Sequence, residues 1–182
     1  MSEASAQPKT CDHTSVGIIV RNPQRDIAVI KRRNFPIAYA PPAGHCDGDS
    51  YPDAAIREAK EEIGVEILSQ QKVFEGTFYN PCRRNNGDHH HWQIFEADEW
   101  RGTPAAGSDA QELIWLPKSG LVSLASRTAH IAEQYVLQGN TKRGPLAHLL
   151  ANDLAWQMNP GLELVWCLML TSMKMIRVLP HI

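Results

Sequence analysis

Residues 57–65 of the chain read REAKEEIGV, and this short stretch predicts a helix with one acidic face. Glu58, Glu61 and Glu62 occupy relative positions 0, +3 and +4, a spacing that brings side chains onto the same side of a helix. The opposite side is apolar enough to pack against a sheet and carries Ala55, Ile56, Ala59 and Ile63. We therefore expect the helix to lie on a sheet and to hold its carboxylates toward a cleft.

The residues around this stretch predict where the helix begins and ends. Ser50 is a favoured N-cap, Asp53 lies three residues further on in the capping-box position, and Pro52 is tolerated in the first turn. Gly64 can adopt the left-handed conformation that ends a helix. The expected helix spans residues 51–63.

Three carboxylates this close repel one another and raise the pKa of at least one of them, unless a cation lies between. Magnesium or manganese, which prefer oxygen ligands, would suit this position. The alternative is a solvated acidic face, steadied by Arg57 with Glu61 at the i, i+4 spacing, and helical spacing alone favours it. The preceding loop of sequence AGHCDGD, residues 43–49, together with the capped helix and its glycine stop, makes the pattern more specific than the acidic triplet alone.

The overall composition indicates one domain with a real core. The 182 residues carry 18 Lys and Arg against 20 Asp and Glu, a formal charge of −2, and 43% of them are hydrophobic. A near-neutral net charge argues against a protein whose whole surface binds nucleic acid, and a nucleic-acid partner is not expected.

Three features favour a soluble, cytoplasmic protein without a membrane partner. The N-terminal residues lack the basic and apolar regions of a signal peptide, and the longest apolar run near the end, residues 164–170, is too short to cross a bilayer. The four cysteines, at positions 11, 46, 82 and 167, form no CxxC pair, which favours a reducing compartment.

The rest of the chain predicts an α+β fold with a mixed β-sheet. β-Branched and alternating patterns indicate strands at residues 15–20, 26–30, 36–40, 65–68, 72–79, 90–97 and 112–116, with the first two joined as a hairpin. Helical spacing begins after residue 119, and the apolar stretch 162–178 suits a helix better than a strand.

We expect three segments: a polar tail over residues 1–13, a main domain over 14–140 and a helical extension over 141–182. The extension is rich in Met and Trp. It would pack on the same domain or on a partner in a homodimer.

The pattern around the helix resembles the Nudix hydrolase signature, G-x5-E-x7-R-E-U-x-E-E-x-G-U, in which U is a bulky aliphatic residue. The second half is matched by Arg57, Glu58, Glu61, Glu62, Gly64 and Val65. In the first half Asp49 stands in place of a glutamate, four residues separate it from Gly44, and the later aliphatic position holds Ala59. Residues 39–45, YAPPAGH, look like the segment that leads into this box.

The resemblance implies an α/β/α sandwich and water attack on a pyrophosphate bond in a nucleotide-type substrate. By the same resemblance Glu58, Glu61 and Glu62 would be metal ligands for Mg²⁺ or Mn²⁺, and Arg57 would orient a glutamate. A divalent cation neutralises the substrate's anionic phosphates and makes water a better nucleophile. Two alternatives remain, a catalytically silent Nudix-like nucleotide-binding or regulatory module and an acidic-helix scaffold without a nucleotide role.

Several other residues are candidates for the site. Glu112 is the first choice for a further catalytic acid and Asp109 the second, although an ordinary strand-edge charge explains Glu112 equally well. Besides Gly44, the substrate-binding candidates are Tyr39, whose ring can stack on a base, and Arg83 and Arg84, whose N–H groups can bind phosphate. Solvated loop arginines are the commoner case.

Cys82 and the run His89, His90 and His91 suggest a transition-metal site at first sight. Successive strand residues face opposite sides of a sheet, so the three histidines cannot all bind one ion. Cys11 and His13 are far away in the sequence. We therefore expect a polar strand start, or one substrate-facing histidine, in preference to a zinc site.

Overall fold

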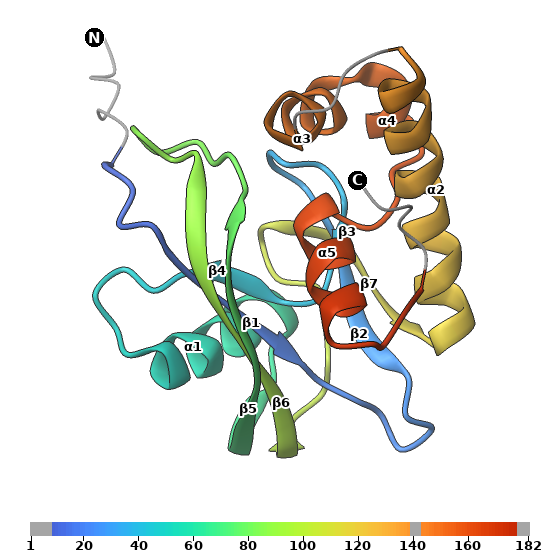
Figure 1. The fold of residues 1–182 in the computed structure, drawn as a ribbon. Coiled ribbons are helices and arrows are strands. Elements are labelled where there is room, and N and C mark those ends of the chain that lie inside the picture. The colour runs from blue at the N-terminus through green and yellow to red at the C-terminus, as the bar shows by residue number, and fades with distance from the viewer. Residues whose placement is uncertain (1–8, 139–142, 178–182) are drawn as a thin grey trace, which may run out of the picture.

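The computed structural model of the protein describes residues 9–138 and 143–177, and two β-sheets form its centre (Figure 1). The elements in chain order are β1 (Thr14–Ile19), β2 (Ile27–Arg32), β3 (Tyr39–Ala40), β4 (Ala43–His45), α1 (Tyr51–Ile63), β5 (Glu66–Tyr79), β6 (His89–Arg101), β7 (Ala110–Leu116), α2 (Lys118–Leu137), α3 (Arg143–Asn152), α4 (Leu154–Met158) and α5 (Leu164–Ser172). One sheet has the strand order β4-β1-β6-β5 and the other β3-β2-β7. β1 runs parallel to β6 and antiparallel to β4, so the four-stranded sheet is mixed.

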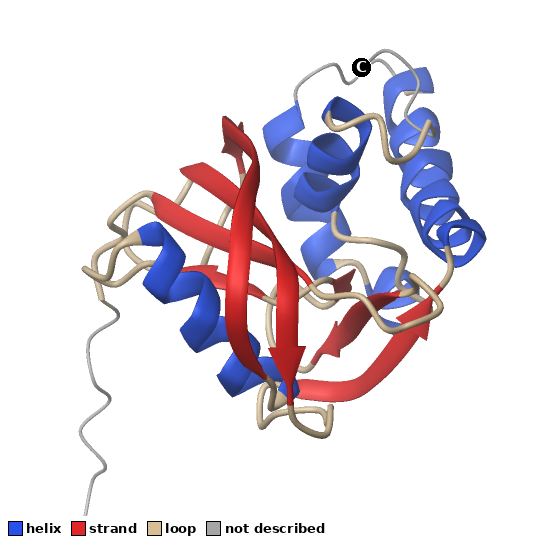
Figure 2. Cartoon of the chain, turned by 90° about the horizontal axis from the view of Figure 1, so that it is seen from below, coloured by secondary structure: helices blue, strands red, loops and turns tan. Residues whose placement is uncertain are grey.

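Helices cover the strands on two opposite sides (Figures 1 and 2). Val16 and Ile18 of β1 belong to the core cluster that contains the apolar face of α1, whereas Ile19 belongs to the cluster that contains α2 and α5. All three side chains are fully buried, because neighbouring strand residues face opposite layers. The α+β fold, with a mixed sheet and additional C-terminal helices, agrees with the sequence prediction.

α1 begins and ends where its local sequence predicts. The Ser50 hydroxyl accepts the backbone N–H of Asp53 at 3.3 Å, and Gly64 takes a φ of 72° while its N–H donates to the carbonyl of Lys60. Ala55, Ala59 and Ile63 are fully buried. The helix is thus fixed at both ends and along its apolar side, which orients its acidic side.

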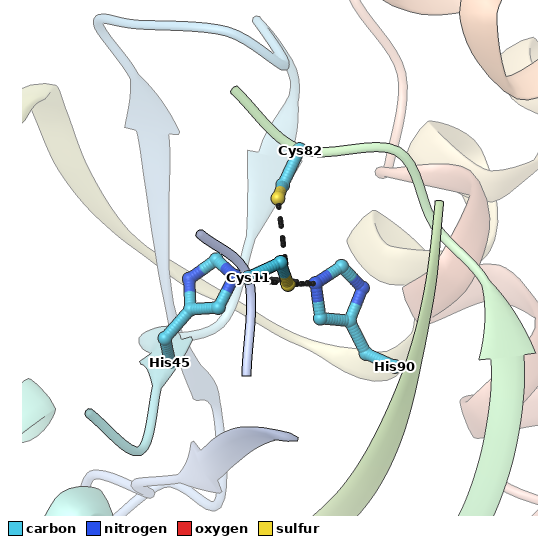
Figure 3. Close-up of side chains that lie close together, drawn as sticks. All are labelled: Cys11, His45, Cys82 and His90. Atoms are coloured by element: carbon cyan, nitrogen blue, oxygen red, sulfur yellow. Dashed lines mark hydrogen bonds between the residues drawn. The ribbon is translucent and has the colours of Figure 1, made fainter. Parts of the chain in front are cut away.

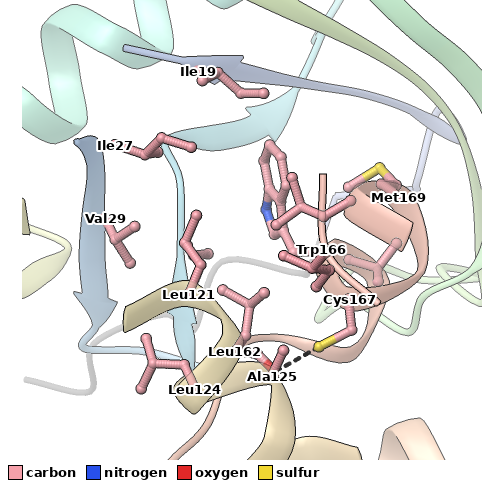
Figure 4. Close-up of a cluster of buried hydrophobic side chains, with 14 of the residues drawn as sticks. Ile19, Ile27, Val29, Leu121, Leu124, Ala125, Leu162, Trp166, Cys167 and Met169 are labelled. Carbon is pink, nitrogen blue, oxygen red and sulfur yellow. Dashed lines mark hydrogen bonds between the residues drawn. The ribbon is translucent and has the colours of Figure 1, made fainter. Parts of the chain in front are cut away.

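α5 fills the second face of β1 (Figure 4). Its Trp166 ring is fully buried, and it lies so close to Gly17 that a Cβ at that position would stand 2.5 Å from Cζ2 of the indole. Trp92 of β6 meets the same ring edge-on, with 6.4 Å between ring centroids. The helix predicted within residues 162–178 is therefore present over Leu164–Ser172.

Several strand predictions were wrong. Residues 43–45, which were expected in a loop, form the short strand β4, and the strand expected at 36–40 is present only at Tyr39–Ala40. β1 and β2 enter different sheets and do not form a two-stranded hairpin. Their ends are linked by an isolated bridge between Arg21 and Ile27 and by the bond from the Ala28 N–H to the Val20 carbonyl. Segments 65–68 and 72–79 are one strand, β5, since the polar residues between them still pair with β6. β5 is an edge strand with register shifts, which allows polar side chains to continue in it.

Parts of the expected terminal segments lie outside the described residues: 1–8 of the tail, and 141–142 and 178–182 of the extension. Among the helices that the structure describes, none has both the length and the apolarity needed to cross a membrane.

The contact between β1 and α5 can be tested by Gly17→Ala. We expect this change to lower the free energy of unfolding by about 1–3 kcal/mol, because the added methyl group overlaps the Trp166 ring. Gly76→Ala in β5 is the matched control, since its nearest neighbours are partly exposed Phe74 and Phe78 rings that can move. Urea unfolding measures the free energy of unfolding of both variants. Equal losses in the two variants would contradict the tight packing at Gly17.

Candidate active site

The acidic side of α1 faces a cavity of about 560 Å³. The cavity lies between α1, β4, the loop that joins β5 to β6, and the residue that precedes α5. Eight of the residues selected from the sequence line it: Gly44, Arg57, Glu58, Glu61, Glu62, Arg83, Arg84 and Asp109. The structure thus brings the helical carboxylates and the loop arginines to one place.

Glu58 and Glu62 are buried against β4, with 7% and 8% of their surface exposed, whereas Glu61 is exposed. The backbone N–H of Ala43 donates to Oε2 of Glu62 at 2.8 Å. A Cβ at position 44 would overlap the Glu58 carboxylate, so only glycine leaves room for it there. β4 therefore shapes the position of both buried carboxylates.

Arg57 connects α1 with the loop before it. Its Nη1 donates to Oε1 of Glu58 at 2.6 Å and to Oε2 of Glu61 at 3.3 Å. Its Nε donates to Oδ2 of Asp49 at 2.9 Å, and its Nη2 donates to the carbonyl of His45 at 2.8 Å. Asp49, which departs from the signature, still serves as an anionic partner of Arg57. The guanidinium orients the carboxylates.

Burial controls the charge of the two inner carboxylates. It raises the pKa of Glu62 to about 7, against the lowering effects of Arg32 and of the Ala43 N–H. Burial also raises the pKa of Glu58, against the charge and hydrogen bond of Arg57. The local cations therefore do not fully compensate these carboxylates. An all-carboxylate donor set of this kind fits a hard divalent cation such as Mg²⁺ or Mn²⁺.

Arg32 and Glu163 line the cavity but were missed in the sequence. Glu163 is 7% exposed, and its Oε2 has no hydrogen-bond partner among the residues described. Burial raises the pKa of Glu163 and the charge of Arg32 opposes this rise. A single acid in the otherwise apolar run 162–170 could have indicated it, because carboxylates are rarely buried without a partner or a role.

Tyr39 and Glu112 lie outside the lining of this cavity. Both pair with Lys31 of β2 in the three-stranded sheet, one from β3 and the other from β7. The Tyr39 hydroxyl donates to Oε1 of Glu112 at 2.6 Å. Burial and this bond raise the pKa of Tyr39 to about 12. Asp109, the second choice for the additional acid, does line the cavity.

Comparison with known proteins relates this geometry to a family. The family model described as NUDIX domain matches residues 12–137. A search of curated proteins found no match. Three similar solved structures are a MutT from a study of the Aliivibrio salmonicida and Vibrio cholerae proteins, the MutT NUDIX hydrolase of Burkholderia pseudomallei and the MutT protein of Methanosarcina mazei Go1.

The three structures resemble this chain in fold. Their sequence identities are 21%, 20% and 16%, and their TM-scores are 0.50, 0.51 and 0.51. The matches cover 60%, 59% and 66% of this chain and 83%, 84% and 85% of the respective relatives.

The raised pKa of Glu62 has a consequence for stability. Without added divalent cation, the folded state keeps a proton on Glu62 up to a pKa of about 7, whereas the unfolded chain loses it near 4.5. Stability from this group is therefore complete below pH 4.5 and is lost as the pH rises to about 7, by roughly 3 kcal/mol.

Glu62→Gln should accordingly weaken the fall in unfolding free energy between pH 5 and pH 8, and should stabilise the cation-free protein at pH 8. Urea unfolding across this range measures the effect. The same measurement on Glu133→Gln, at an exposed carboxylate of α2, is the control. An unaltered slope in Glu62→Gln would show that this carboxylate is not the source.

Proposed function

The chain belongs to the NUDIX domain family, and on that premise we propose that it hydrolyses a pyrophosphate bond in a nucleotide-type substrate with the help of a divalent cation. The observation that carries the proposal is the cavity wall on which Glu58, Glu61 and Glu62 meet, with Arg57 bonded to two of them. A solvated acidic helix face would not bury two of its three carboxylates.

In this proposal Glu58, Glu61 and Glu62 hold Mg²⁺ or Mn²⁺. The cation, when bound, would neutralise the phosphate oxygens and activate the attacking water. Arg57 acts as a positioning residue, because its bonds to Glu58, Asp49 and the His45 carbonyl fix the carboxylates relative to the loop.

The substrate's phosphates would meet the arginines on the other side of the cavity. Arg84 is held by Asp47, with 2.8 Å between Nη2 and Oδ2, and this pair stiffens the loop that joins β5 to β6. Arg83, next to it, is exposed and lines the cavity. We assign phosphate binding to Arg83 and a positioning role to Arg84, because guanidinium groups match phosphate oxygens in geometry and charge.

Hydrolysis also requires a group that accepts the proton of the attacking water. As water adds to phosphorus, the bridging P–O bond breaks and the proton passes to a carboxylate. Glu163 suits this role because its buried Oε2 is unpartnered within the described part of the chain and lines the same cavity as Glu58 and Glu62. The proposal therefore includes the C-terminal helices in the catalytic domain, since the residue that precedes α5 completes the cavity.

A substrate panel tests the function. Nucleoside triphosphates, dinucleoside polyphosphates, nucleotide sugars, ADP-ribose and capped RNA are incubated with Mg²⁺ or Mn²⁺, and phosphorus NMR in oxygen-labelled water identifies the bond that breaks. Glu61→Gln and Glu62→Gln should lower kcat by about 100-fold or more, because each removes a cation ligand. Glu133→Gln, an exposed carboxylate on α2, is the control.

Two results would contradict the hydrolase proposal. Full turnover by both ligand variants would exclude these carboxylates from catalysis. Binding of an intact nucleotide without turnover of any substrate would instead support a nucleotide-binding or regulatory module.

The choice of proton acceptor is tested separately. Glu163→Gln should lower kcat by at least about 10-fold and change the acidic limb of the pH profile, since the variant cannot accept a proton. Glu112→Gln should keep activity within about 3-fold, because that carboxylate bonds to Tyr39 outside the cavity. Circular dichroism checks that both variants fold. The reverse pattern of losses would assign the role to Glu112.

A further inference from the structure

A second group of side chains lies beside the carboxylates and has a different chemistry (Figure 3). Cys11 precedes β1, His45 ends β4, Cys82 lies in the loop that joins β5 to β6, and His90 belongs to β6. Their sulfur and ring-nitrogen atoms all lie within 4.8 Å of one another. Four segments that are distant in sequence thus place two thiols and two imidazoles around one point.

The distances match the edges of a tetrahedron around a zinc ion. With Zn–S near 2.3 Å and Zn–N near 2.0–2.1 Å, two sulfurs stand about 3.8 Å apart, two nitrogens about 3.4 Å, and a sulfur and a nitrogen about 3.6 Å. Here the two Sγ atoms are 3.9 Å apart and the two Nε2 atoms 3.2 Å apart. Cys11 Sγ lies 3.7 Å from His45 Nε2 and 3.1 Å from His90 Nε2.

The backbone around both sulfurs is arranged as in a thiolate site. The N–H of His13 donates to Cys11 Sγ at 3.3 Å, and the N–H of Arg84 donates to Cys82 Sγ at 3.4 Å. In each case the donor is two residues after the cysteine, and such bonds stabilise negative charge on sulfur. A Cβ at Gly87 would overlap Cys82 Sγ, so the loop is shaped around this atom.

Only one of the three consecutive histidines takes part, as strand geometry requires. His90 is fully buried and faces the two cysteines. His89 bonds to Asp88, and the ring of His91 lies 3.1 Å from Glu75 on the other face of the strand. The sequence argument against a three-histidine site therefore holds, but it does not exclude a site that uses His90 alone.

We propose that Cys11, His45, Cys82 and His90 bind one zinc ion in a four-coordinate structural site, separate from the carboxylates of α1. Thiolate and imidazole donors select zinc over magnesium, and four protein ligands leave no open position for catalysis. A disulfide explains the group less well, because it would need the sulfurs near 2.05 Å and would leave the two histidines without a role.

The site would hold two parts of the cavity wall, the end of β4 and the loop that joins β5 to β6, against the Cys11 segment and β6. His45 and Cys82 line that cavity, as do Gly44 and Arg83 next to them. The Cys11 segment already pairs with the loop after β5 through the bond from Cys11 N–H to the Asn85 carbonyl at 2.9 Å. Zinc would therefore hold the proposed phosphate-binding loop in place without touching substrate.

The first experiment measures zinc directly. The protein is purified with a cleavable tag free of histidine from cells grown with added zinc, and its metal content is determined by mass spectrometry. One zinc per chain is expected. After removal of the metal, Co²⁺ should give tetrahedral d–d absorption and a sulfur-to-cobalt charge-transfer band. A protein without zinc that gives neither band would overturn the proposal, as would an intramolecular disulfide between Cys11 and Cys82 in place of metal.

The second experiment uses variants. Cys82→Ser changes a half-buried loop residue and should weaken zinc binding by at least about 100-fold in a competition assay with a metal indicator, as should His90→Asn. His91→Asn and Cys46→Ala are matched controls that should keep one zinc. Circular dichroism identifies variants that fail to fold. Unchanged zinc affinity in folded Cys82→Ser would overturn the assignment. These readouts are independent of hydrolysis, so failure of either proposal can be recognised separately.

Discussion

The rest of the site depends on the hydrogen bonds of the Arg57 guanidinium. A single guanidinium bonds to Glu58 and Glu61 on its own helix, to Asp49 in the preceding loop and to the His45 carbonyl at the end of β4. Charge-assisted bonds of this kind are strong and directional, so the acidic helix and the loop form one unit. Without them, buried carboxylates would face one another with too little positive charge nearby. His45, whose carbonyl accepts a bond from Arg57, also belongs to the cysteine–histidine group.

The parts of the fold that the sequence predicts well are those determined locally. Ser50 and Gly64 cap α1 through neighbours a few residues away, so its boundaries are predictable. Strand pairing is not local. β1 pairs with β6, more than 70 residues further along the chain, and a turn signal between two apolar segments gives no information on such a distant partner. The position of Glu112 likewise depends on its register with Lys31, which no sequence pattern reveals.

Some site residues were not predicted from the sequence for the same reason: only long-range packing brings them together. Glu163 and Arg32 are far apart in the chain, and only the packing of α5 on the sheet brings them to one cavity. The four members of the cysteine–histidine group have no short spacing of the kind that marks zinc ribbons. Two chemistries, hard carboxylate oxygens and soft sulfur with imidazole, therefore adjoin each other, and each can select its own cation.

The contact between Gly17 and Trp166 also constrains the order in which the protein can mature during synthesis. β1 leaves the ribosome before α5, the last described helix, which helps to cover its second face. Residues of β2 and α2 that belong to the same core cluster as Ile19 are made earlier, but the Trp166 ring can reach Gly17 only once α5 has been made. The second face of β1 therefore stays incompletely covered until α5 has been synthesised.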